Sequence, residues 1–251
     1  MKSLRLALSF LTVIPIRAEA PQPGDLGRSA TWFPLIGFGL GLILAVAYRL
    51  FSLIFPHLIA AALTVALWAA LTGGLHLDGL ADCCDGLLAM ATPDRRLEIM
   101  RDPRLGSFGV IGLTLFLILK VLAVPSFDYP GFSSVLPLTI PVATCISRWL
   151  IIVVAFQPQV RPDGLGADFA RGLTGRTALL AALLPLAGVA LFTILGDWRL
   201  LVAVILAHLL TFAIIALARA RLGGVTGDVF GLTVELSELV ILLTFVANVP
   251  L

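Results

Sequence analysis

The chain has 251 residues, of which 59% are hydrophobic and only 13% are charged. Soluble globular domains are about 45–50% apolar and about 25% charged, so this composition argues against a soluble protein and predicts one integral membrane domain over residues 1–251. The formal net charge of +2 argues against nucleic acid as a partner. Cys83 and Cys84 are adjacent and Cys145 lies in an apolar run, so structural disulfides are not expected.

The N-terminal segment combines Lys2 and Arg5 with an apolar run from Leu6 to Ile16. It resembles a signal peptide, but the run ends without a good small-residue cleavage site. The sequence therefore predicts a retained helix that is interfacial or re-entrant.

Seven segments are long and apolar enough to cross a bilayer at about 20 residues each. None alternates like a barrel strand, so we predict an all-α fold: a polytopic helical membrane bundle of about seven transmembrane helices plus the N-terminal helix. The predicted spans are 32–55, 57–76, 106–127, 135–156, 177–196, 199–218 and 230–250.

The distribution of Lys and Arg among the loops predicts the orientation of the bundle. With the N-terminus in the cytoplasm, the cytoplasmic loops receive most of the basic residues, whereas only Arg49 and Arg199 fall on the opposite side. Every polar motif then lies on the cytoplasmic side. We therefore expect a multi-pass protein with its N-terminus and a single active site facing the cytoplasm.

The first polar motif, residues 73–86, follows the second predicted span. In a helix, Asp78, Asp82 and Asp85 would share one face within roughly 60° of each other. Their mutual repulsion favours a bound divalent cation, and magnesium usually arrives with a substrate phosphate. The motif predicts a metal or phosphate site, against the alternative of a polar helix end at the interface. His76 could be a ligand, a base or an interfacial histidine.

The second motif, residues 101–109, places Arg101 and Arg104 before small residues at an expected helix start. Such a loop can clamp a phosphate, although ordinary positive-inside anchoring is an equal alternative.

Lys120 and Arg148 lie inside apolar runs, where an ionisable side chain costs several kcal/mol unless it is paired or faces water. Both are therefore candidates for binding an anionic substrate.

Two further segments are polar. The loop 157–176 contains Arg161 and could cover a substrate or serve as a simple linker. Residues 223–231 contain Thr226 and Asp228, and they lead into a predicted helix that carries Glu235 and Glu238. Asp228 and Glu235 are seven residues apart, which predicts a second acidic helix face. Two acidic helices on the cytoplasmic side could together hold one or two divalent ions.

With these motifs together, the chain resembles the cobalamin-5'-phosphate synthase family, also called adenosylcobinamide-GDP ribazoletransferases. The blocks that carry the resemblance are His76–Gly86, Arg101–Gly109, and Gly223–Gly231 with the two glutamates that follow. Phe10–Pro15 is similar to the N-terminal block of the family, with Val13 where Arg is expected. The resemblance implies a magnesium-dependent enzyme of the cell inner membrane that joins adenosylcobinamide-GDP to α-ribazole or its 5'-phosphate and releases GMP, late in cobalamin biosynthesis.

The resemblance also implies roles for individual side chains in this phosphoryl transfer. Metal ligands would be acidic, substrate-binding residues would hold phosphate oxygens, and a general base would take the proton of the attacking hydroxyl. The predicted metal ligands are Asp82, Asp85, Asp228 and Glu235; the predicted substrate-binding residues are Arg101, Arg104, Lys120, Arg148, Arg161 and Thr226; the predicted catalytic residues are His76, Asp78 and Glu238.

Two alternatives to this function remain at the level of sequence. A CDP-alcohol phosphotransferase has an Asp-Gly-x-x-Ala-Arg element that Asp78–Asp82 matches only in part. A membrane transporter would line a pathway with Lys120, Arg148 and the acids, but the acids cluster at one face and no inverted repeat is visible. A lipid bilayer is an expected partner in each case, and the sequence is compatible with a monomer or an oligomer.

Overall fold

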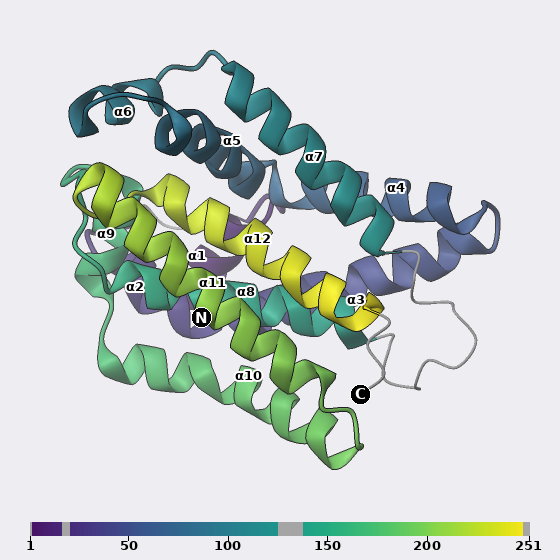
Figure 1. Ribbon diagram of the computed structural model, residues 1–251. Coiled ribbons are helices and arrows are strands. Elements are labelled where there is room, and N and C mark those ends of the chain that lie inside the picture. The colour runs from purple at the N-terminus through teal and green to yellow at the C-terminus, as the bar shows by residue number, and fades with distance from the viewer. Residues whose placement is uncertain (1, 17–20, 125–137, 248–251) are drawn as a thin grey trace.

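The structure of the protein, a computed structural model, describes residues 2–16, 21–124 and 138–247 (Figure 1). Within these residues the secondary structure is helical, apart from one isolated parallel bridge between Gln159 and Val225. The all-α prediction is confirmed. The helices are α1 (Lys2–Leu11), α2 (Asp25–Ser29), the short 3-10 helix η1 (Ala30–Trp32), α3 (Phe33–Ser52), α4 (His57–Thr72), α5 (Leu75–Leu88), α6 (Pro93–Ile99), α7 (Ser107–Ala123), α8 (Thr139–Ala155), α9 (Leu165–Gly172), α10 (Gly175–Ile194), α11 (Arg199–Leu222) and α12 (Gly227–Val246).

Each of the seven predicted spans contains one apolar helix of this bundle. Among the described residues, four helical segments are individually long and apolar enough to cross a membrane: Asp25–Ser52, α10, α11 and α12. Helices α7 and α8 are apolar but shorter, at 17 residues each. Residues 125–127, 135–137 and 248–250 of the predicted spans lie outside the described residues. The composition of the helices supports a multi-pass membrane protein.

The boundary predicted for the second span is wrong. The span was expected to continue to residue 76, but α4 ends at Thr72 and the chain bends by 93° before α5 begins. Gly73 and Gly74 adopt left-handed conformations with φ of 62° and 70°, which glycine tolerates because it lacks a Cβ atom. The acidic motif therefore lies on a separate helix, α5, and it is helical as predicted.

Helix α12 lies at the centre of the bundle and packs against α5, α8 and α11 (Figure 1). Its side chains are buried over most of the length from Val229 to Phe245. On the other side of α8, a Cβ atom added to Gly37 or Gly41 of α3 would clash with the backbone of Thr144 or Pro141. Such close backbone contact through small residues is typical of helix packing in membranes.

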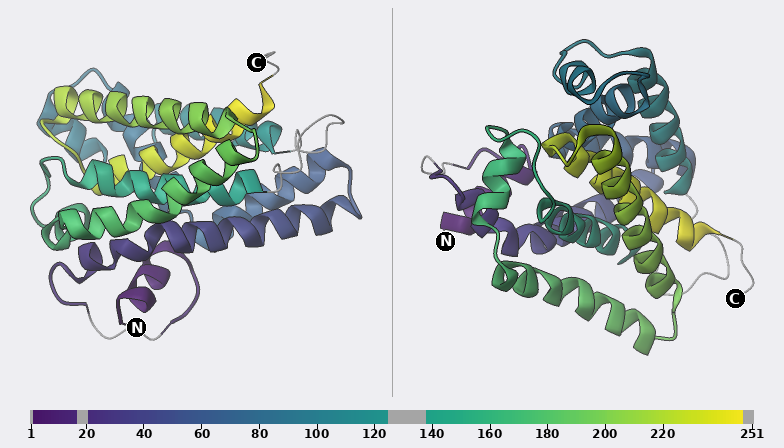
Figure 2. Two further views of the ribbon diagram at one scale, coloured as in Figure 1. Left: turned by 90° about the horizontal axis from the view of Figure 1, so that it is seen from below. Right: turned by 60° about the vertical axis from the view of Figure 1, so that its left-hand side comes forward.

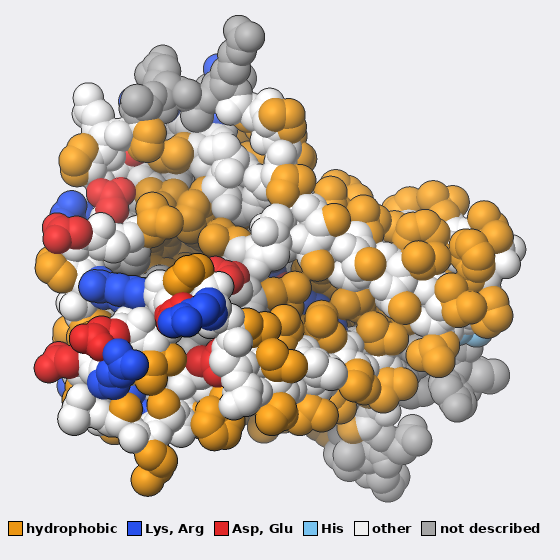
Figure 3. Space-filling view, turned by 90° about the horizontal axis from the view of Figure 1, so that it is seen from above, with side chains coloured by type: hydrophobic (Ala, Val, Ile, Leu, Met, Phe, Trp, Pro, Cys, Tyr) orange, Lys and Arg blue, Asp and Glu red, His pale blue; other side chains and the backbone are white. Residues whose placement is uncertain are grey.

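Most of the exposed charged side chains gather at one end of the molecule. Figure 3 shows them at the left of the face seen from above, where α5, α6 and the start of α7 lie, whereas the rest of that face is largely hydrophobic. The hydrophobic surface includes many exposed leucine and isoleucine side chains of α3, α7, α10 and α11. We call this charged end the polar end; it also holds α9 and the start of α12 (Figure 1).

Helix α1 lies beside the bundle, near the start of α3 (Figure 2). Its 10 residues span only about 15 Å, which is too short to cross a bilayer. Ala7 and Leu11 are buried against the bundle, while Lys2 and Arg5 are exposed. The predicted N-terminal helix is present, and its interfacial placement stays a prediction.

Candidate active site at the polar end

A cavity of about 240 Å³ opens at the polar end between α5, the segment 159–167, α9 and the start of α12. Among the predicted site residues, it brings together those that come from α5, from the loop after α8 and from the start of α12. These residues are His76, Asp78, Arg161, Thr226 and Asp228.

Two glycines allow α5 and α12 to meet at this cavity. A Cβ atom added to Gly79 would lie 2.8 Å from the carbonyl oxygen of Asp228, and one added to Gly231 would lie 2.9 Å from that of His76. Both distances are too short for a real Cβ atom, so glycine is required where the backbones cross. This contact brings Asp78 and Asp82 of α5 within electrostatic range of Asp228.

Arg161 connects the covering loop to the start of α12. Its Nη1 donates a hydrogen bond of 2.8 Å to Oδ2 of Asp228, and Thr226 Oγ1 donates to the same oxygen at 3.1 Å. Its Nη2 donates to the carbonyl oxygen of Leu97 in α6 at 3.2 Å. Its Nε is buried without a hydrogen-bond partner in the described part of the chain.

The loop 157–176 folds over the cavity. Val160 N donates to the carbonyl oxygen of Val225 at 3.1 Å, and Val225 N donates to that of Pro158 at 2.9 Å, so the loop is paired with the segment that precedes α12. Helix α9 is held from the other side, because Gly24 N donates to Oδ1 of Asp168 at 3.0 Å. These contacts favour the covering-loop interpretation over that of a simple linker.

Two helices begin at the cavity. Gly164, Leu165 and Gly166 at the start of α9 line it, and so do Thr226 and Gly227 at the start of α12. The first N–H groups of a helix have no partner within the helix, and the helix dipole favours negative charge there. Together with the Arg161 guanidinium, the two helix starts suit the phosphate groups of a substrate.

Asp85 does not face this cavity. Its Oδ2 accepts a hydrogen bond from Gly106 N at 2.8 Å and its Oδ1 accepts one from Gly109 N at 2.8 Å. The carboxylate therefore satisfies two free N–H groups at the start of α7. It also lines a second cavity of about 390 Å³, between α6 and α7, together with Arg104.

Replacing Asp85 with alanine should destabilise the protein by about 1–2 kcal/mol, because two N–H groups at the start of α7 lose their acceptor. Thermal unfolding of the purified protein in detergent measures the effect. The control is Asp163→Ala, which removes an exposed carboxylate from the covering loop and should leave the melting temperature unchanged. Equal melting temperatures for the two variants would contradict a capping role.

The predicted phosphate clamp lies apart from the main cavity. Arg104 donates two hydrogen bonds to Asp102, from Nε to Oδ1 at 2.9 Å and from Nη2 to Oδ2 at 2.7 Å. The Arg104 side chain and its backbone N–H lower the pKa of Asp102 to about 2, so this carboxylate stays ionised near neutral pH. Arg101 is exposed and lines neither cavity.

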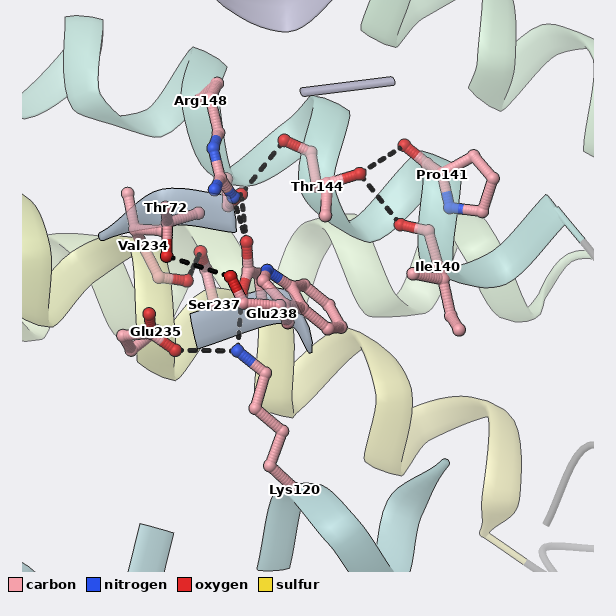
Figure 4. A network of polar contacts seen from close by, with 12 residues as sticks. Thr72, Lys120, Ile140, Pro141, Thr144, Arg148, Val234, Glu235, Ser237 and Glu238 are labelled. Atoms are coloured by element: carbon pink, nitrogen blue, oxygen red, sulfur yellow. Dashed lines mark hydrogen bonds and ion pairs between the residues drawn. The ribbon is translucent and has the colours of Figure 1, made fainter. Parts of the chain in front are cut away.

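The remaining four predicted residues form a buried ionic network between α7, α8 and α12 (Figure 4). Lys120 Nζ donates to Glu235 Oε2 at 2.7 Å and to Glu238 Oε2 at 2.8 Å. Arg148 Nη1 donates to Glu238 Oε1, which also accepts a hydrogen bond from Ser147 Oγ at 3.1 Å. The charged side chains are at most 3% exposed, and two positive charges balance two negative ones.

The network supplies the charge partners that Lys120 and Arg148 need when they are buried. A buried Lys or Arg needs a partner, and the partners are the glutamates of α12, which do not line the main cavity. The ring of Trp68 adds a cation–π contact, 3.9 Å from the Lys120 nitrogen. His76 lies within electrostatic range of Arg148, Glu238 and Lys120, so it stands between this network and the cavity that it lines.

The acidic side chains at the polar end bear on the predicted magnesium site. In the described ranges, no three Asp, Glu, His or Cys side chains gather closely enough to hold a metal ion. Both oxygens of Asp85 accept hydrogen bonds at the start of α7, and Glu235 pairs with Lys120. Of the other two predicted ligands, Asp228 lines the cavity and accepts hydrogen bonds from Arg161 and Thr226 through Oδ2 alone. Asp82 lies within electrostatic range of Asp228 but does not line the cavity. Magnesium commonly uses one or two carboxylates plus waters and substrate phosphates. The residues therefore fit an ion that is shared with a substrate, and they do not fit a cage made by protein alone.

Some cavity residues were missed by sequence reasoning. Phe10, Phe230, Ile151 and Gln159 line the cavity from α1, α12, α8 and the following loop. Three of them are hydrophobic residues in a chain that is 59% hydrophobic, so no local pattern separates them from ordinary packing residues. Phe169 lies within the segment 157–176, and its place in the cavity wall depends on how α9 folds back.

The comparisons with known proteins agree with the motifs. The family model described as cobalamin-5-phosphate synthase matches residues 3–246. The adenosylcobinamide-GDP ribazoletransferase of Geotalea daltonii is 38% identical over 248 residues, or 96% of each chain, and that of Stutzerimonas stutzeri is 40% identical over 247 residues, also 96% of each. The Desulfitobacterium hafniense protein of the same name is 36% identical over 255 residues, 97% of this chain and 96% of the relative. No solved structure gave a match.

Proposed function

Because the chain belongs to the cobalamin-5-phosphate synthase family, we propose that it is an adenosylcobinamide-GDP ribazoletransferase of cobalamin biosynthesis. It joins the adenosylcobinamide phosphate group to α-ribazole or α-ribazole 5'-phosphate and releases GMP. A ribazole oxygen forms the new bond to phosphorus, and the bond from that phosphorus to the bridging pyrophosphate oxygen breaks. The observation that carries the proposal is the cavity where Arg161 and Asp228 meet the starts of α9 and α12.

The cavity supplies what this reaction requires. Phosphoryl transfer depends mainly on in-line positioning and on neutralising the charge of the phosphate oxygens. The Arg161 Nε and the first N–H groups of α9 and α12 would hold the pyrophosphate. Magnesium, held by Asp82 and Asp228 together with the substrate, would offset the charge that develops on the leaving GMP.

We assign the proton acceptor to Asp78. Its carboxylate lines the cavity from an exposed position on α5. Glu238 is a poorer candidate, because both of its oxygens accept hydrogen bonds from Lys120, Arg148 or Ser147 away from the cavity. A base needs to reach the attacking hydroxyl directly or through one water, and the position of Asp78 in the cavity lining supports this assignment.

The proposed setting is the cell inner membrane, with the polar end and the N-terminus on the cytoplasmic side. The support is the sequence count, which assigns most Lys and Arg of the loops to that side and only Arg49 and Arg199 to the other. A nucleotide-linked substrate in the cytoplasm would then reach the cavity directly.

The test is a reaction of the purified protein with adenosylcobinamide-GDP and α-ribazole. We expect GMP and a corrinoid product in equal amounts when magnesium is present, and at least about a hundredfold less when a chelator removes it. Restoring magnesium should restore the rate. Absence of GMP release under all these conditions would overturn the proposed activity, and full activity in the chelator would overturn the magnesium assignment.

A further inference from the structure

One side of the cavity is aromatic. Phe10 of α1, Phe169 of α9 and Phe230 of α12 all line it, and we call these three rings the aromatic wall. Phe33 of α3 lies behind them, with ring centroids 5.8 Å from Phe10 and 5.3 Å from Phe169. The Phe169 and Phe230 centroids are 5.9 Å apart. Since the four rings come from four helices, the wall is held in place by tertiary packing.

The cavity therefore presents two kinds of surface. Polar lining residues come mainly from α5, the Arg161 loop and the start of α12. The aromatic wall and Ile151 of α8 contribute aromatic and aliphatic carbon atoms to the lining, and their side chains carry no hydrogen-bonding atoms. A ligand that fits both surfaces carries a flat apolar group at one end and a polar or charged group at the other.

We propose that the aromatic wall binds the benzimidazole base of α-ribazole and so selects the nucleoside substrate; this inference rests on the proposed function. The base is a flat bicyclic ring with an apolar edge, which suits stacking and edge contacts with phenylalanine. With the base on this wall, the ribose and its hydroxyl would extend toward Asp78 and Arg161.

The other parts of the two substrates fit the wall less well. Guanine presents several donors and acceptors along its edge, and an apolar wall would leave them unpaired at a cost in binding. A corrin ring carrying an adenosyl group is far larger than a cavity of about 240 Å³. The base of α-ribazole is small enough for the cavity, and its edge is apolar like the aromatic wall.

The first experiment compares two buried phenylalanines in the same assay. Phe169→Leu keeps an apolar side chain but removes the ring, and it should raise the KM for α-ribazole on the order of tenfold, with the KM for adenosylcobinamide-GDP changed by less than about twofold. The matched control is Phe192→Leu in α10. Both rings are 1% exposed, and Phe192 packs edge-on against Phe245 at 6.0 Å as Phe169 does against Phe230 at 5.9 Å.

The second experiment changes the base. A riboside that carries imidazole in place of benzimidazole lacks the second ring, so the wild-type protein should use it with a much lower kcat/KM than α-ribazole. Phe169→Leu should reduce that preference at least about fivefold, whereas general loosening of the fold would lower both activities together. If Phe169→Leu does not yield folded protein, Phe10→Leu on the partly buried α1 ring provides the same comparison.

Three outcomes would overturn the proposal. One is an unchanged preference between the two ribosides, another is a rise in KM for adenosylcobinamide-GDP in place of α-ribazole, and the third is an equal effect of Phe192→Leu. Failure of the proposed function itself is distinguishable, because the wild-type protein would then release no GMP with any riboside.

Discussion

Replacing Asp228 with asparagine is expected to lower the kcat of GMP release by roughly a hundredfold or more while the protein stays folded. Asparagine preserves the size of the side chain, so the effect isolates the charge. Asp228 lines the cavity and accepts hydrogen bonds from Arg161 and Thr226. Loss of its charge removes a proposed magnesium ligand and the partner that orients the Arg161 guanidinium.

The measurement is GMP release by purified protein at saturating substrates, repeated over a magnesium titration. Asp82→Asn should reduce kcat to a similar extent, because Asp82 is the other acid assigned to the shared ion. The control is Asp94→Asn, which neutralises an exposed acid in α6 and should behave as wild type. Near-normal kcat and unchanged magnesium dependence in either Asp228→Asn or Asp82→Asn would remove the shared-ion model.

Replacing Lys120 with methionine is expected to lower the free energy of unfolding by about 3–5 kcal/mol. Lys120 is the common partner of Glu235 and Glu238, at 2.7 Å and 2.8 Å. Without it, two buried carboxylates share the single charge of Arg148, and one negative charge stays uncompensated. Methionine has a similar shape, so the loss comes from charge and hydrogen bonding rather than from a cavity.

Thermal unfolding in detergent and the yield of folded protein measure this loss. The double variant Lys120→Met/Glu235→Gln returns the network to zero net charge and should recover part of the stability. Lys2→Met, at the only other lysine of the chain, is the control; its side chain is 49% exposed and its ion pair with Asp25 is 3.5 Å long, so removal should cost about 1 kcal/mol or less. A Lys120→Met protein as stable as wild type would contradict the role assigned to the network.

Local sequence patterns were sufficient to predict the class of fold and the position of the polar end. Long apolar runs require helices, because a backbone in hydrocarbon must pair its own polar groups. The helical spacing of Asp78, Asp82 and Asp85 was confirmed in α5. The expectation of a second acidic helix beside it is confirmed for Asp228, since the glycines in both motifs allow α5 and α12 to touch.

The sequence by itself therefore determined that this protein is a helical membrane bundle with a polar end, because those properties follow from composition and from contacts between near neighbours. Only the tertiary structure decided what each charged residue contacts. Lys120 meets Glu235 and Glu238 across separations of 115 and 118 residues, and Asp85 caps a helix whose start is 21 residues away. The bend at Gly73 and Gly74 and the folding back of α9 decide which side chains line the cavity. These outcomes depend on how whole helices pack, and residue spacing along the chain does not encode that packing.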